Sequence, residues 1–77
     1  MILKIITPER EILSEDVELV ELPGAMGRFE VLRGHAPLIS SLDPGTVRYV
    51  QGGESKQIET GSGFVEVRDN IITVCVG

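Results

Sequence analysis

The segment Thr46–Thr60, TVRYVQGGESKQIET, carries the clearest structural signal in the sequence. Gly52 and Gly53 stand at its centre, between two runs of residues that favour an extended backbone. A Gly-Gly pair supplies the positive φ angles of a tight hairpin turn. In the first run apolar residues recur with a period of two, as they do along one face of a strand. The segment therefore predicts a β-hairpin with arms Thr46–Gln51 and Glu54–Thr60.

Similar short runs with a period of two lie on both sides of this hairpin. Asp69-Asn70 separates the last two runs, which predicts a second hairpin, and turn residues occur every eight to ten positions elsewhere. No run has helical spacing. The pattern predicts an all-β fold, a flattened β-sandwich or barrel in a single domain over residues 1–77. The further expected strands are Ile2–Ile6, Glu11–Ser14, Val17–Leu22, Phe29–Leu32, Phe64–Arg68 and Ile71–Val76.

Two irregular positions are expected in the first half of the chain. Apolar residues change face near Leu19-Val20, which predicts a β-bulge at this point. Pro23-Gly24 interrupts the extended pattern, so that Gly24–Arg28 is predicted to be a loop.

The composition predicts a small protein that depends on a partner. A chain of 77 residues buries only about 60% of its unfolded surface, so its stability is marginal. Cys75 is the only cysteine, which excludes an internal disulfide and fits a reducing compartment.

The net charge of −5 excludes nucleic acid as a partner, because binding to phosphate requires a basic patch. It also argues against docking on anionic lipid. No segment approaches the roughly 20 apolar residues of a membrane span, and no leader is recognisable. We therefore expect a soluble protein of the cytosolic compartment, without direct membrane insertion.

Catalysis is not expected from these residues. His35 is the only histidine, and Ser62 lies in Gly61-Ser62-Gly63, which lacks the G-x-S-x-G pattern of a nucleophile elbow. One histidine and one cysteine are too few for an ordinary zinc site. The glycines match no phosphate-binding pattern. We predict no catalytic, cofactor or metal site, which leaves a binding or structural module.

The segment Glu21–Val50, ELPGAMGRFEVLRGHAPLISSLDPGTVRYV, resembles the epsilon subunit of the F-type ATP synthase. The tail ETGSGFVEVRDNIITVCV, residues 59–76, resembles the strand that closes the same domain. The nested signals are Pro23-Gly24, Gly27 two residues before Phe29, Gly34-His35-Ala36-Pro37-Leu38, and Pro44-Gly45 before Arg48.

This resemblance implies a flattened β-sandwich of about ten strands, the N-terminal domain of epsilon. The family usually continues into two C-terminal helices, which this sequence does not contain, and we expect either a naturally short epsilon or a truncated one. It implies a non-catalytic rotor subunit in the central stalk, which links the gamma subunit to the c-ring and couples proton flow to ATP synthesis. It also implies a peripheral position on the cytoplasmic face of an energy-transducing membrane.

The resemblance also implies two sets of contact residues. Thr7, His35 and Ser40 correspond to gamma-facing positions of the family. The segment from Met26 to Arg33 corresponds to its ring-facing loop, where many members carry an acidic residue at the position of Arg28. The residues expected to face the ring are Met26, Gly27, Arg28, Glu30 and Arg33.

Several alternatives stay open from the sequence. His35 has a structural explanation beside the interface one, since Pro37 restricts the corner. Met26 is either a local plug or a ring contact. The aromatic residues, Phe64 among them, are expected to be core or edge residues. The alternative function is a free-standing β-sandwich that binds a peptide along an exposed edge strand.

Overall fold

Nine β-strands and no helix make up the computed structural model, which describes all residues from 1 to 77. The all-β prediction is confirmed, with one strand fewer than the ten that the resemblance implied. The strands are β1 (Ile2–Ile6), β2 (Glu11–Asp16), β3 (Leu19–Gly24), β4 (Gly27–Leu32), β5 (Leu38–Leu42), β6 (Gly45–Gln51), β7 (Glu54–Thr60), β8 (Gly63–Arg68) and β9 (Ile71–Val76). No helix is present that is long and apolar enough to cross a membrane.

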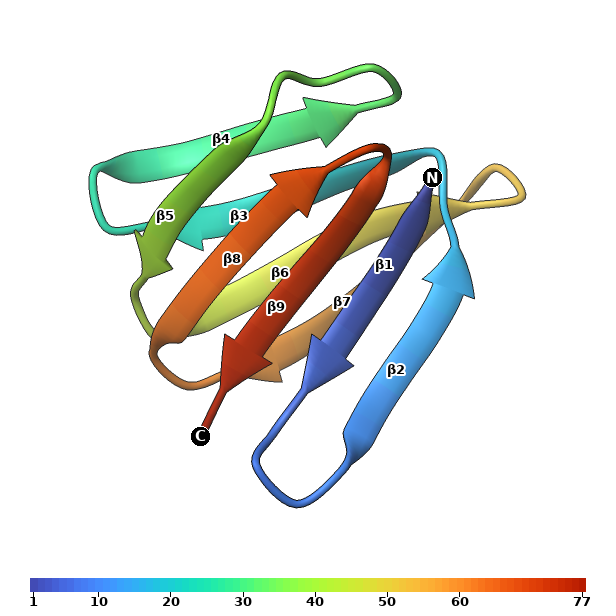
Figure 1. Ribbon diagram of the computed structural model, residues 1–77. Coiled ribbons are helices and arrows are strands. Elements are labelled where there is room, and N and C mark those ends of the chain that lie inside the picture. The colour runs from blue at the N-terminus through green and yellow to red at the C-terminus, as the bar shows by residue number, and fades with distance from the viewer.

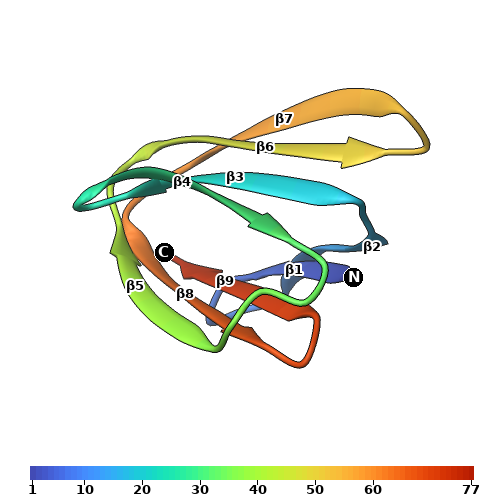
Figure 2. The same cartoon turned by 90° about the horizontal axis from the view of Figure 1, so that it is seen from above.

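The strands form two layers that are connected at one side. The first sheet has the order β2-β1-β9-β8-β5, and the second sheet has the order β4-β3-β6-β7 (Figures 1 and 2). They join where Gly24 of β3 pairs with Leu42 of β5. β1 and β9 are parallel, whereas the other paired strands are antiparallel. The result is a flattened sandwich with one connected side.

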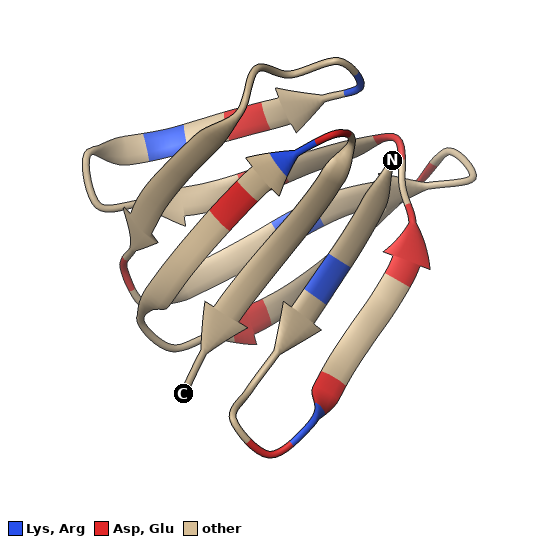
Figure 3. Cartoon of the chain, in the orientation of Figure 1, with Lys and Arg blue, Asp and Glu red and all other residues tan.

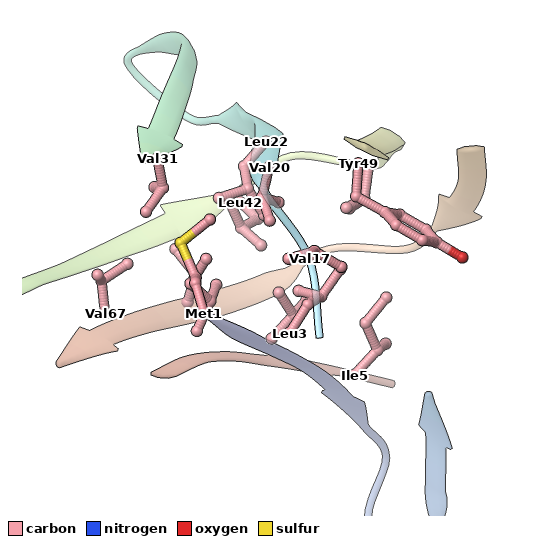
Figure 4. Packing of buried hydrophobic residues seen from close by; sticks show 14 residues of the cluster. Met1, Leu3, Ile5, Val17, Val20, Leu22, Val31, Leu42, Tyr49 and Val67 are labelled. Carbon is pink, nitrogen blue, oxygen red and sulfur yellow. The ribbon is translucent and has the colours of Figure 1, made fainter. Parts of the chain in front are cut away.

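The hydrophobic core fills the space between the two layers. Figure 4 shows Leu3 and Ile5 of β1 in this space, together with Leu22 and Val31 of the second sheet. These four side chains are fully buried, and the core contains no buried polar or charged residue. The alternation of buried and exposed residues along the strands therefore sets which face of each sheet is free for a partner.

Both predicted hairpins are confirmed. Gly52 and Gly53 have φ angles of 59° and 79°, and Asp69 and Asn70 have 53° and 60°. Positive φ at both central residues is the conformation of the tight turn that matches the twist of two paired strands. Glycine adopts it without cost, and Asp and Asn tolerate it better than other residues with a side chain.

The predicted bulge near Leu19-Val20 is wrong. β3 pairs with β4 without a register shift from Leu19 to Gly24. The change of face arises because the strand begins only at Leu19, while the buried Val17 lies in the connection before it. The irregular register lies instead between Ile5 and Ile6, where β1 pairs with β2.

The predicted loop Gly24–Arg28 is also wrong. β3 extends to Gly24 and β4 begins at Gly27, so that only Ala25 and Met26 form the turn between them. Two residues are enough for a hairpin turn, and Gly27 takes a φ angle of 126°. The proline and glycine that suggested a break are thus part of a continuous hairpin.

Candidate interaction surfaces

The outer face of the first sheet exposes apolar side chains. Phe64 of β8 is half exposed, at 50%, because its neighbour Val65 points into the core. Ile39 of β5 is 72% exposed, next to the inward-facing Leu38. An exposed apolar patch on a soluble protein marks a site where a partner or ligand binds.

The strand register extends this apolar surface across the sheet. Phe64 pairs with Ser41 on one side and with Cys75 on the other, and Cys75 pairs with Ile6. Directly paired residues share a face, so these side chains form a row on the outside of the first sheet. β5 and β9, which supply two of them, carry no charged residue, whereas β8 carries Glu66, which pairs with Ile39, and β1 carries Lys4 (Figure 3).

A shallow groove of about 400 Å³ lies along this row and includes Ile6, Phe64 and Cys75 in its lining. Thr7, one of the three residues expected to face gamma, is part of its wall. The Thr7 hydroxyl accepts a hydrogen bond from the backbone N–H of Arg10, at 3.2 Å, and thereby stabilises the turn between β1 and β2. The groove is lined by Ile6, Thr7, Pro8, Ser62, Gly63, Phe64, Cys75, Val76 and Gly77.

His35, the second of these residues, is exposed in the corner between β4 and β5. Its backbone N–H donates to the Leu32 carbonyl oxygen at 3.1 Å, and its Nδ1–H donates to the carbonyl oxygen of Ala36 at 2.7 Å. Gly34 has a φ angle of 83°, and its N–H donates to Asn70 Oδ1 at 2.7 Å. The imidazole contributes only one local bond, so its other edge is free for a partner.

Ser40, the third residue, points to the other face of β5. It pairs with the buried Val65 and is itself half-buried, and its hydroxyl donates to the carbonyl oxygen of Ser41 at 3.1 Å. A partner on the outer face therefore meets Ile39 and Ser41 there. β1 and β5 run in the same direction within the first sheet, so Thr7 and His35 lie at opposite ends of it (Figure 1).

The residues expected in a ring-facing loop lie mostly on a strand. Met26 is 99% exposed at the tip of the β3–β4 hairpin, which excludes a local plug. Gly27, Arg28 and Glu30 belong to β4, and Arg33 follows the far end of that strand. The glycines in this segment favour a loop, and the sequence pattern does not show that the turn contains only Ala25 and Met26. Met26 and Arg33 are therefore separated by the length of β4.

Arg28 is engaged within the domain, on the outer face of the second sheet. One guanidinium nitrogen donates to the carbonyl oxygen of Thr46 at 2.9 Å, and the other lies 3.5 Å from a Glu21 carboxylate oxygen. Arg48 Nε donates to the same oxygen at 3.1 Å. This face of the sandwich thus carries an ion-pair cluster, with Glu21 between two arginines.

The two arginines change the ionisation of their neighbour. The hydrogen bond from Arg48, together with the charges of Arg48 and Arg28, holds the pKa of Glu21 below its ordinary value. The same hydrogen bond raises the pKa of Arg48. A depressed carboxylate pKa stabilises the fold above the unfolded value of 4.5, and this contribution is lost as the pH falls through the folded pKa.

We expect Glu21→Gln to lower the melting temperature at neutral pH, because the amide keeps the shape of the side chain but loses its charge. The difference from the wild type should shrink below pH 4.5, where the wild-type carboxylate takes up its proton. Melting curves at neutral and acidic pH measure this. A difference that is the same at both would show that the ion pairs do not cause it.

No group of three or more histidine, cysteine, aspartate or glutamate side chains lies close enough to hold a metal ion. The structure offers surfaces for contact, namely the apolar outer face of the first sheet, the His35 corner and the Met26 tip. Sequence reasoning did not identify Ile39 or Phe64 as surface residues. Each follows or precedes an apolar residue on the same strand, Leu38 or Val65. Because neighbouring residues of a strand face opposite sides, one member of each pair must lie on the surface.

The whole chain, residues 1–77, matches the family model for the ATP synthase delta/epsilon chain β-sandwich domain. It is 46% identical over 72 residues to the ATP synthase epsilon chain of Desulfitobacterium hafniense strain Y51, which covers 94% of this chain. It is 49% identical over 74 residues to that of Magnetococcus marinus, which covers 96%. The chain spans about half, 54%, of the length of each of these relatives.

Two solved structures share the fold of this chain. A chain of the Euglena gracilis mitochondrial ATP synthase, in a structure of OSCP, F1 and the c-ring, superposes with a TM-score of 0.89 at 25% identity. The match covers 99% of this chain and 49% of that one. A chain from the central stalk and c-ring of the Tetrahymena thermophila enzyme shares the fold, with a TM-score of 0.80 at 19% identity over 99% and 62% of the two chains.

Proposed function

This chain belongs to the family of the ATP synthase delta/epsilon chain β-sandwich domain, and from that premise we propose that it is a non-catalytic rotor subunit of an F-type ATP synthase. It links the gamma subunit to the c-ring in the central stalk and couples proton flow to ATP synthesis. It lies on the cytoplasmic face of the energy-transducing membrane, as a peripheral component.

The observation that carries this proposal is the apolar outer face of the first sheet. Ile39 and Phe64 are large apolar side chains exposed to 72% and 50%, and no part of the chain covers them. Exposed apolar side chains are more stable when a partner covers them, and a rotor subunit is bound to its neighbours in the stalk permanently. We assign this face to gamma, with Ile39 on β5 and Phe64 on the neighbouring β8, and with Thr7 and His35 at its two ends.

The c-ring contact belongs to a different part of the domain. Met26, at 99% exposure, projects from the tip of the β3–β4 hairpin beyond the body of the sandwich (Figure 1). We assign this tip, with Gly27 beside it, to the polar loops of the ring. Arg28 and Glu30 follow on the outer face of β4, where Arg28 already bonds to Glu21 and Thr46.

A rotor subunit must transmit torque without deforming. The domain has 46 backbone–backbone hydrogen bonds, and 39 of them lie within the strands, so the two faces are held on one hydrogen-bonded framework. Protein interiors are packed as densely as molecular crystals and have low compressibility. A load applied at the Met26 tip is therefore transmitted to the gamma face as a movement of the whole domain.

Peptide binding is not favoured at the two outermost edge strands, β7 and β2. β7 is a free edge of the second sheet, and it carries Glu54, Lys56 and Glu59. β2, one edge of the first sheet, carries Glu11, Glu15 and Asp16. Charged residues on an edge strand are how natural sheets discourage the addition of another strand.

The proposal is tested with purified gamma and the 77-residue chain. We expect a stable complex at micromolar concentration, and we expect His35→Ala to weaken it about tenfold, as for a contact residue worth more than 1 kcal/mol. The melting temperature should fall by less than about 4 °C, which corresponds to less than about 1 kcal/mol for a domain of this size.

No binding of the wild type to gamma at this concentration would overturn the proposal. If His35→Ala lowered the affinity only in proportion to its loss of stability, His35 would be a turn-forming residue and not a contact.

A further inference from the structure

Two surface segments that are far apart in the sequence are bonded to each other at one end of the sandwich. The corner Arg33–Pro37 connects the two sheets, and Asp69-Asn70 is the turn between β8 and β9. The bond between them is the one from Gly34 N–H to Asn70 Oδ1, at 2.7 Å across 36 positions of the chain. It is a side-chain bond, so it depends on the identity of residue 70.

Asn70 is held in place by its own backbone. Its φ angle is 60°, in the left-handed region, and its carbonyl oxygen accepts the N–H of Ile2 at 2.9 Å. The turn is thereby fixed to the start of β1 as well as to β8 and β9. The amide side chain of Asn70 projects from a rigid position, which makes it a suitable anchor for a more exposed segment.

The corner itself has few other bonds to the sandwich. All residues from Arg33 to Pro37 are exposed. Within the corner, the backbone bond from His35 N–H to Leu32 and the imidazole bond to Ala36 are both local. The bond from Gly34 to Asn70 is the one that joins the corner to the first sheet. Without it, the position of His35 relative to Ile39 and Phe64 depends on the chain connections alone.

We propose that Asn70 is a positioning residue, which fixes the His35 corner against the first sheet and so orients it for gamma. This inference rests on the proposed docking of gamma on the first sheet. Asn70 itself acts through the corner and makes no contact with gamma in this assignment. A segment that is held in its bound conformation loses less entropy on binding, so fixing the corner raises the affinity.

The chain offers a matched set of variants. Asn70→Gly keeps the left-handed backbone and removes the acceptor oxygen. Asp69→Gly makes the same kind of change at the neighbouring left-handed residue, without touching the bond to Gly34. Asn70→Asp keeps both an acceptor oxygen and a side chain that tolerates positive φ. Any effect of turn flexibility alone would appear equally in Asn70→Gly and Asp69→Gly.

Hydrogen exchange and gamma affinity are measured for all four proteins. We expect Asn70→Gly to speed the exchange of the Gly34 amide and to weaken gamma binding about threefold to tenfold, the size of one net hydrogen bond. Asp69→Gly and Asn70→Asp should each have a Gly34 exchange rate and an affinity for gamma close to those of the wild type. Unchanged exchange at Gly34, or equal affinities of the two glycine variants, would overturn the inference.

The experiment distinguishes failure of the rotor assignment from failure of the role proposed for Asn70. A wild-type chain that does not bind gamma overturns the rotor assignment. A wild type that binds while Asn70→Gly binds equally well overturns only the role of Asn70.

Discussion

Gly63→Ala is expected to destabilise the domain by about 3 kcal/mol or more, the upper range for overpacking a site that cannot relax. A Cβ at this position would lie 1.9 Å from the carbonyl oxygen of Cys75 and 3.1 Å from the Cα of Val76. Both are backbone atoms of β9, the strand paired with β8, so no side chain can rotate to make room. Accommodating the methyl group requires the two strands to separate at this end.

The loss of unfolding free energy expected for Gly63→Ala is large relative to the total stability of the domain. A domain of this length is stable by roughly 4–11 kcal/mol, at about 0.05–0.15 kcal/mol per residue. Urea denaturation of the wild type and the variant measures the difference. Gly61→Ala is the matched control, because a Cβ there meets nothing within 4 Å. It should remain within about 1 kcal/mol of the wild type. Similar stabilities of the two variants would contradict the close packing of β8 on β9.

Ile39→Asp is expected to weaken binding to gamma about a hundredfold, the effect of an exposed apolar contact residue replaced by a charge. Ile39 is 72% exposed, so the free domain hardly depends on it for its core. In the complex, the new carboxylate would be buried beside Glu66, the residue that pairs with position 39, and burying a carboxylate without a cationic partner is costly. Titration calorimetry against gamma measures the affinity, and thermal melting of the variant shows whether its fold is intact.

The control for this prediction lies on the opposite sheet. Leu32 is 48% exposed and pairs with Leu19 on the outer face of the second sheet. Leu32→Asp makes the same chemical change on a face that we do not assign to gamma, so its affinity for gamma should stay within about threefold of the wild type. If Leu32→Asp lost binding and Ile39→Asp kept it, the interface would lie on the second sheet.

The parts of the fold that are local in sequence could be predicted from it. The turns at Gly52-Gly53 and Asp69-Asn70 depend on two adjacent residues, and both hairpins were predicted correctly. The predicted strand Phe29–Leu32 starts two residues later than β4, because Gly27 is typical of a loop and can equally begin a strand after a two-residue turn. Local composition does not distinguish these two cases.

The contact surfaces were harder to predict, because they depend on which face of each strand is buried. In Leu38–Leu42 the residues Leu38, Ser40 and Leu42 share one face, and only the pairing with β8 shows that this face is the inner one. The family resemblance indicates Ser40 as a contact residue for gamma, whereas the structure exposes its neighbour Ile39 on the outer face. The bond from Gly34 to Asn70 joins residues 36 positions apart and leaves no pattern in the sequence.

A chain that belongs to the rotor must turn with gamma, and this rotation can be observed on single F1 molecules. A bead is attached to a cysteine at the exposed position of Gln57, on the second sheet, in a Cys75→Ser background, and the chain is bound to immobilised F1 containing gamma. With ATP, we predict that the bead rotates in one direction together with gamma. A bead that binds to F1 but stays fixed while gamma turns would contradict the rotor assignment.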